Sequence, residues 1–137
     1  MTAHRAGALL AALSLAAAAC GGGRGQAVQE IQRARAGRLE VVLLSPTGAL
    51  HHGKDRFVVE FRSASGGGLV DVGAVKGSAV MSMSGAPMLG SLEVRPTGVP
   101  GRYEVESDLS MAGTWRTIFE WSGPAGSGSV ALSGPVQ

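Results

Sequence analysis

The sequence predicts an all-β domain, an immunoglobulin-like antiparallel β-sandwich of about seven strands, preceded by a signal peptide and a flexible linker. From residue 39 onward, short apolar or alternating runs are separated by turns rich in Gly, Pro and Ser. No helical periodicity accompanies them beyond the N-terminal segment. The chain has a single cysteine, so an internal disulfide is excluded and burial of the core must hold the fold.

The first 19 residues have the layout of an export signal. His4 and Arg5 precede an apolar run that ends in four alanines directly before Cys20. This run is shorter than the roughly 20 residues that a membrane-spanning helix needs. The segment resembles a bacterial lipoprotein signal peptide, which is cleaved before a cysteine that becomes lipidated. The alternative is a plain secretory signal followed by an incidental cysteine.

We divide the chain into a signal peptide (1–19), a lipidated Cys20 with a flexible linker (20–37) and a β-domain (38–137). The linker begins with a glycine-rich stretch, and its polar remainder, 26–36, would form one or two turns of helix at most. Its arginines either favour an anionic lipid surface or belong to a solvated tether. From residue 39 onward, seven Lys/Arg face nine Asp/Glu with no basic patch, so nucleic acid is not an expected partner.

The expected strands follow one another through the domain. In the second expected strand, Phe57, Val59 and Phe61 share one face. In the sixth, one face is formed by Trp115, Thr117, Phe119 and Trp121. The third run is long for a strand, so we expect a bulge or bend near Gly77. The seven expected strands are 39–44, 56–62, 69–83, 90–95, 102–107, 113–121 and 127–132.

The sequence does not indicate an enzyme. The exported part has only two histidines, adjacent at His51 and His52, and no cysteine beyond the anchor, so no Ser-His-Asp or Cys-His set is available. The glycines at 66–68 lie between two strands, where a phosphate-binding loop would need a following helix.

Methionines are the remaining residues of the sequence that could carry chemistry, as candidate metal ligands. Antiparallel strand order places three turns at one end of the sandwich, and these carry His51, His52, Met83, Met88 and Met111. Thioether sulfur and imidazole suit copper. We therefore expect a soft-metal site at this rim, with Met81 as a further ligand or a core residue. The alternative is that all the methionines fill the core of a metal-free interaction module.

Three segments carry a resemblance to a known family: the Met-containing stretch 81–88, the Pro-Gly-Arg-Tyr turn at 100–103 and the Met-Ala-Gly-Thr-Trp stretch at 111–115. Together they resemble the YtkA-like domain, related to FixH-type proteins. The Met-Pro pairing usual in that family is altered here to Met81-Ser82-Met83. The resemblance implies a small β-sandwich of exported proteins, also found beside heavy-metal efflux adaptors. We therefore expect a membrane-anchored envelope protein that binds copper for buffering or hand-over to an efflux or assembly partner.

The residue after Cys20 also indicates which membrane would hold the lipoprotein. Gly21, rather than an acidic residue, follows Cys20, which resembles lipoproteins sorted to an outer membrane and facing the periplasm in a Gram-negative organism.

The anchor can be tested directly. Changing Cys20 to Ser should release the protein from membranes or leave its signal uncut, because no other segment is apolar and long enough to hold it. Cell fractionation with detection of the cleaved form measures both. A mutant that stays firmly membrane-bound after signal removal would exclude the lipoprotein interpretation.

Overall fold

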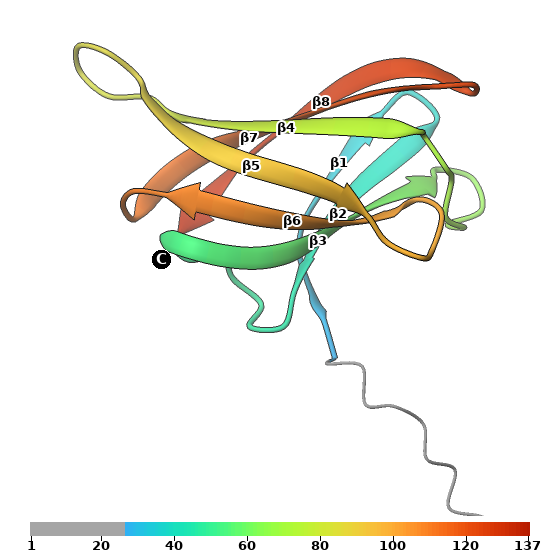
Figure 1. Cartoon of the computed structure of the whole chain (residues 1–137), viewed down its shortest axis with the longest axis horizontal. Helices are drawn as coiled ribbons and strands as arrows, with labels where there is room; N and C mark the ends of the chain where they lie inside the picture. Colours follow the sequence, from blue (N-terminus) through green and yellow to red (C-terminus); the bar gives the residue numbers. More distant parts are fainter. Residues whose placement is uncertain (1–26) are drawn as a thin grey trace, which may run out of the picture.

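The computed structural model describes residues 27–137; the expected signal peptide and Cys20 lie outside the described residues. The described part is built from strands (Figure 1). None of its residues belongs to a helix that could cross a membrane. The strands are β1 (Gln29–Ala36), β2 (Leu39–Ser45), β3 (Gly53–Ser63), β4 (Ala74–Met81), β5 (Met88–Pro96), β6 (Arg102–Leu109), β7 (Gly113–Gly123) and β8 (Gly126–Val136).

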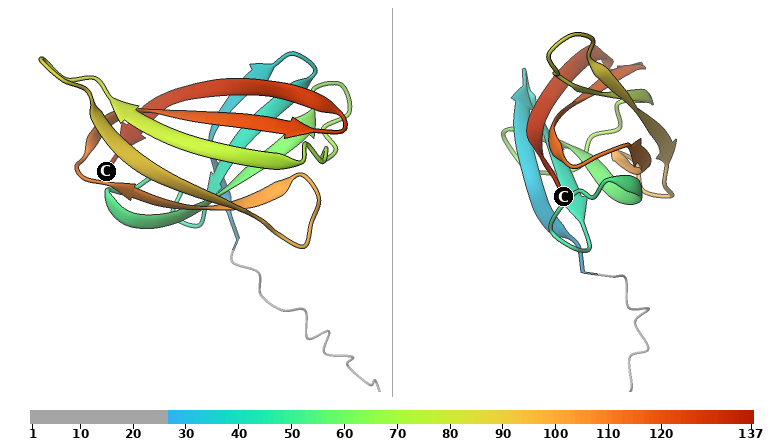
Figure 2. Two further views of the ribbon diagram at one scale, coloured as in Figure 1. Left: turned by 45° about the horizontal axis from the view of Figure 1, so that its top comes forward. Right: turned by 90° about the vertical axis from the view of Figure 1, so that its left-hand side faces the viewer.

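The strands form one antiparallel sheet in the order β1-β2-β3-β6-β5-β4-β7-β8. The sheet curls until its edge strands, β1 and β8, lie side by side, as the end-on view in Figure 2 shows. Gln32 Nε2 donates to the main-chain oxygen of Ser133 across this junction, at 2.5 Å. The expected all-β antiparallel class is therefore confirmed, as a nearly closed sandwich or barrel with one strand more than expected.

The additional strand is β1, in the segment that we expected to be linker or helix. It pairs with β2 from Gln29 opposite Ser45 to Ala36 opposite Leu39. Its alternation is hard to see in the sequence because the register shifts between Glu30 and Gln32, and such a bulge breaks a period of two. The polar residues of β1 suit an edge strand, whose outer side is unpaired. The linker expectation is thus wrong for residues 29–36.

The other seven strands lie where the sequence predicts them, except that the long third run is shorter. β4 starts at Ala74 and pairs regularly through Gly77 with both neighbours, so the expected bulge is absent there. The break comes instead at Gly73, which has a φ of 82°. A Cβ at Gly73 would lie 2.7 Å from the carbonyl oxygen of Ser122. Residues 72 and 73 therefore pass directly against the end of β7.

The inner face of the curled sheet forms the core. Trp115, Phe119 and Trp121 point inward from β7, as expected, and Phe61 from β3 makes edge-on contact with Tyr103 and Trp121. Trp115 is only 1% exposed, and its indole N–H donates to the carbonyl oxygen of Met111 at 2.9 Å. The Tyr103 hydroxyl donates to the Gly73 carbonyl at 2.6 Å, and burial raises the pKa of this phenol. Aromatic side chains thus connect the two halves of the sheet.

Trp115 should be a main determinant of stability. Trp115→Ala would remove a buried indole and leave a cavity, so we expect a loss of about 3–5 kcal/mol in the free energy of unfolding. Denaturant titration followed by far-UV circular dichroism measures it. A loss below about 1 kcal/mol would contradict the inward orientation of this side chain.

β1 should be part of the folding unit. A chain that starts at residue 38 lacks the strand that covers one edge of β2, where Val41 to Leu44 are buried. Compared with a chain of residues 21–137, its free energy of unfolding should be lower by about 3 kcal/mol or more, or it should fail to fold. The reason is that the core loses the apolar surface that Ile31 and its neighbours in β1 cover. Equal denaturation midpoints for the two chains would show that β1 is dispensable.

Candidate metal site

Strand register brings the three expected turns to one end of the sheet. Gly53 pairs with Leu109, so the 46–52 and 110–112 turns are neighbours. Ser91 pairs with Asp108 and Met81 with Met88, which adds the 82–87 turn to the same end. In Figure 1 the β6–β7 turn and the C-terminus lie close to each other at this end, and the β4–β5 turn projects from the same end, away from both. We call this end, formed by residues 46–52, 82–87 and 110–112, the rim.

The methionines in the rim and in the strands beside it divide into buried and exposed side chains. Met81 is 7% exposed and belongs to the core cluster that contains Trp115. Met83 and Met111 are 46% and 42% exposed. Two thioethers, on two different turns, therefore reach solvent at this end.

Met88 connects the two groups. It stands directly opposite Met81 in the β4–β5 ladder, so both side chains leave the same face of the sheet. It is partly buried against the core, and its sulfur accepts a hydrogen bond from the Ser110 hydroxyl at 2.8 Å. Sequence reasoning missed the contribution of Ser110, which directly precedes the 111–115 stretch but shows its role only through the fold.

Hydrogen bonds hold both histidines, His51 within its own segment and His52 to the sequence-distant Gln137. The main-chain N–H of His51 donates to the Asp55 carboxylate at 3.0 Å, and His51 Nε2 lies 3.1 Å from the Thr47 hydroxyl. His52 Nδ1 lies 2.8 Å from the main-chain oxygen of Gln137. That oxygen can only accept, so Nδ1 carries the proton and the lone pair of the ring is on Nε2.

The side chains that most often bind metal ions in proteins form no metal-binding group in the described part. Among residues 27–137, no group of three or more His, Cys, Asp or Glu side chains is arranged to hold a metal ion. A site at the rim would therefore depend on thioether sulfur, with imidazole as an auxiliary ligand. Such a donor set favours a soft ion such as Cu(I) and does not suit Mg²⁺ or Ca²⁺, which take oxygen ligands.

A search among curated proteins found no match for this chain. Two solved structures of FetP from uropathogenic Escherichia coli strain F11 are similar in fold. A copper-bound variant is 8% identical, with a TM-score of 0.49, over 80% of this chain and 97% of FetP. An as-isolated form, expressed recombinantly in the periplasm of Escherichia coli, is 11% identical, with a TM-score of 0.50, over 81% of this chain and 97% of FetP. At these identities the likeness concerns the fold alone.

The family comparison is more extensive. The model of the YtkA-like family matches residues 33–120, which include the three segments that carried the resemblance. The match begins inside β1 and ends inside β7, so it spans most of the sheet and the whole rim. The chain therefore belongs to the YtkA-like family.

Proposed function

We propose that this protein is a lipid-anchored envelope protein that binds a soft metal ion, Cu(I), at the rim. Met83, Met88 and Met111 are the expected sulfur ligands, and His52 is the main imidazole candidate. The protein would buffer the ion or pass it to an efflux or assembly partner. The exposure of Met83 and Met111 at one end of the sheet carries this proposal.

Core filling does not explain these two side chains. Fully burying a methionine contributes about 1.5–3 kcal/mol. Met83 and Met111, which are 46% and 42% exposed, forgo a substantial part of that contribution. Only five large apolar side chains in the described part are strongly exposed, and two of them are these methionines. Thioether binding gives their position a chemical reason, because a metal ligand must reach solvent to meet its ion.

The geometry around His52 supports an auxiliary role. A histidine that binds a metal usually donates its other ring N–H to a carboxylate or a main-chain carbonyl, which orients the ring. The hydrogen bond from His52 Nδ1 to Gln137 is of this kind and leaves Nε2 with its lone pair. His51 remains in the proposed set, with Nε2 beside the Thr47 hydroxyl. Met81 is better explained as a core residue beneath the site.

The proposed anchor would bring the rim close to the membrane. β1 begins with Gln29 opposite Ser45, and Ser45 directly precedes the 46–52 turn of the rim. Eight residues lie between Cys20 and Gln29, and a chain of that length spans at most about 30 Å. A lipid at Cys20 would therefore hold the rim within this distance of the membrane, which suits exchange of metal with a membrane-bound partner.

A metal-free interaction module is the second candidate. Two observations favour it: Met81 packs in the core, and the Met88 sulfur already accepts a hydrogen bond from Ser110. In that case Met83 and Met111 would be contact residues for an envelope protein partner.

Metal titration separates the two candidates. A chain of residues 21–137 should bind Cu(I) anaerobically in competition with a chromophoric chelator. Between about pH 7 and about pH 5 the thioether contribution should persist, because sulfur has no competing proton, whereas any imidazole contribution should decline. Replacing Met83, Met88 and Met111 together by Leu roughly conserves volume and should abolish the pH-resistant binding.

The matched control is Met81→Leu, which changes one buried thioether in the same hairpin and should leave the affinity for Cu(I) within about twofold. Ag(I), a soft ion without redox chemistry under these conditions, should follow the same pattern. If the wild type and the triple variant bind Cu(I) equally, or if neither binds it, the methionines serve packing and contact, and the interaction-module function is favoured.

A further inference from the structure

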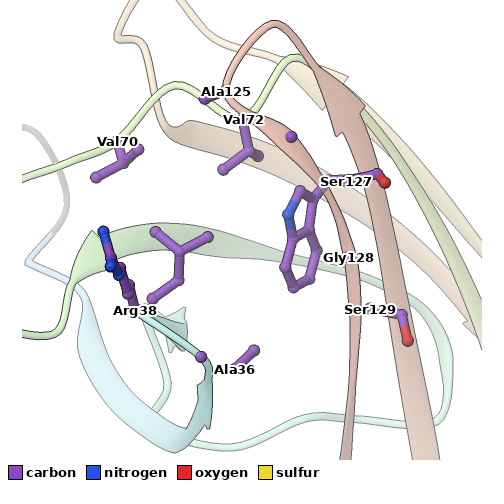
Figure 3. Close-up of a pocket in the computed structure, with 12 residues that line it drawn as sticks. Ala36, Arg38, Val70, Val72, Ala125, Ser127, Gly128 and Ser129 are labelled. Atoms are coloured by element: carbon purple, nitrogen blue, oxygen red, sulfur yellow. The ribbon is translucent and has the colours of Figure 1, made fainter.

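The end opposite the rim contains a hollow that the metal proposal does not use. It has a volume of about 470 Å³, within the range typical of ligand sites. Three segments surround it: the β1–β2 turn, the loop around Val70 and Val72, and the start of β8. Figure 3 shows Ala36 and Arg38 on one side, Ser127 and Ser129 on the other, and Val70 and Val72 across the top. We call this hollow the seam pocket, because it lies between edge strands β1 and β8.

The apolar wall of the seam pocket is rigidly built. Trp121 lines it and is held by edge-on contact with Phe61, whose ring centre is 5.2 Å away. Gly128 lies against the indole, and a Cβ there would come within 2.5 Å of Trp121 Cζ2. Val72 is fixed by the close approach of its carbonyl oxygen to Gly123. The pocket is therefore formed before any ligand arrives, which lowers the entropic cost of binding.

Strand edges border the seam pocket on both sides. β1 pairs only with β2. β8 pairs with β7 and, at the rim end, bridges from Val136 to Leu50, so at the pocket end each of β1 and β8 has one side without a partner strand. The side chain of Gln32 bridges the two edges near Ser133, at the rim end. At the pocket end the hollow lies between Ala36, at the end of β1, and residues 126–129, at the start of β8. Unpaired N–H and C=O groups on such an edge can accept an additional strand.

The mouth of the seam pocket is positively charged. Arg38 lines it, and Arg35 and Arg38 together line an adjoining hollow with residues 63–65. Arg33, Arg56, Arg62 and Arg95 pair with glutamates. Arg35 and Arg38, like Arg102 and Arg116, pair with no carboxylate of residues 27–137. The guanidinium group of Arg38 at the seam pocket, with that of Arg35 at the adjoining hollow, is complementary to an apolar ligand that carries a carboxylate.

We propose that the seam pocket binds an extended peptide segment of a partner protein by strand addition. One apolar side chain of the peptide would occupy the hollow over Trp121, and an acidic side chain or a C-terminal carboxylate would contact Arg35 and Arg38. The peptide backbone would pair with the free edge of β1 or β8. This interaction is independent of the rim, because the two sites lie at opposite ends of the sheet.

Selection from a random library of hexapeptides with free C-terminal carboxylates tests this proposal on residues 21–137. Selected peptides should combine an apolar residue with a carboxylate. Their affinities are then measured by fluorescence anisotropy, and the site is mapped by amide chemical-shift changes. The changes should fall on residues 35–39 and 126–129. N-methylation of alternate peptide nitrogens should weaken binding about tenfold or more, because it blocks strand pairing.

Arg38→Glu is the charge test and should weaken binding about tenfold or more. This side chain is exposed, so the fold should tolerate the change. Arg116→Glu is its matched control, since it makes the same change of charge on β7 beside Val80, near the rim, and should leave the affinity within about twofold.

Several results would overturn the proposal. The library could yield no binder, or binders whose affinity is unaffected by Arg38→Glu or by N-methylation. The chemical-shift changes could instead fall on the rim. Binding of dodecanoate at this pocket in the absence of any peptide binder would identify a site for small amphiphiles. None of these outcomes bears on Cu(I) binding, which the methionine variants test separately.

Discussion

The structure depends on one constraint: a single antiparallel sheet must bury its own inner face. No internal disulfide is available, because the chain has one cysteine, so the apolar side chains of this face provide the cohesion. Curling the sheet brings β7 opposite β3 and β6, and the aromatic contacts of Phe61 with Tyr103 and Trp121 join these strands. Edge-on aromatic pairs add to the burial of their surface, so they define how the sheet closes.

Closure is tighter at one end than at the other, and this difference gives the two ends different properties. At the rim, Gln32 reaches Ser133, Leu50 bridges to Val136, and the main chain of His52 donates to Gln137. At the opposite end, the hollow beside Trp121 lies between the end of β1 and the start of β8. The tight end presents turns with thioethers and imidazoles, whereas the open end presents an apolar cavity and free strand edges.

The proposed metal chemistry follows from what the rim offers. Sulfur from methionine binds without losing a proton, so such a site would keep its ion in a mildly acidic compartment, where imidazole ligands are weakened. Met81 and Met88, paired in one hairpin, illustrate the two roles of methionine in this proposal, core filling and metal binding. Met81 fills the core, and Met88 lies at the boundary between the core and the exposed turn. The proposed site therefore lies directly above the core side chains that stabilise the sheet.

The sequence by itself determined the all-β class, seven of the strands, the inward face of β7 and the grouping of three turns at one end. Alternation of apolar residues and turn chemistry are local signals, and strand order then dictates which turns are neighbours. The tertiary structure decided the rest. β1 contains a bulge that hides its alternation, and its pairing with β2 became visible only in the folded sheet.

Only the fold could also show which methionines are buried. Met81 and Met83 are two residues apart and alike in sequence, but the ladder ends between them, so one is in the core and the other is in solvent. The hollow beside Trp121 likewise depends on contacts distant in sequence, with Gly128 against the indole and residues 36–39 facing 126–129. Spacing along the chain carries no information about such contacts, because they arise when the sheet closes on itself.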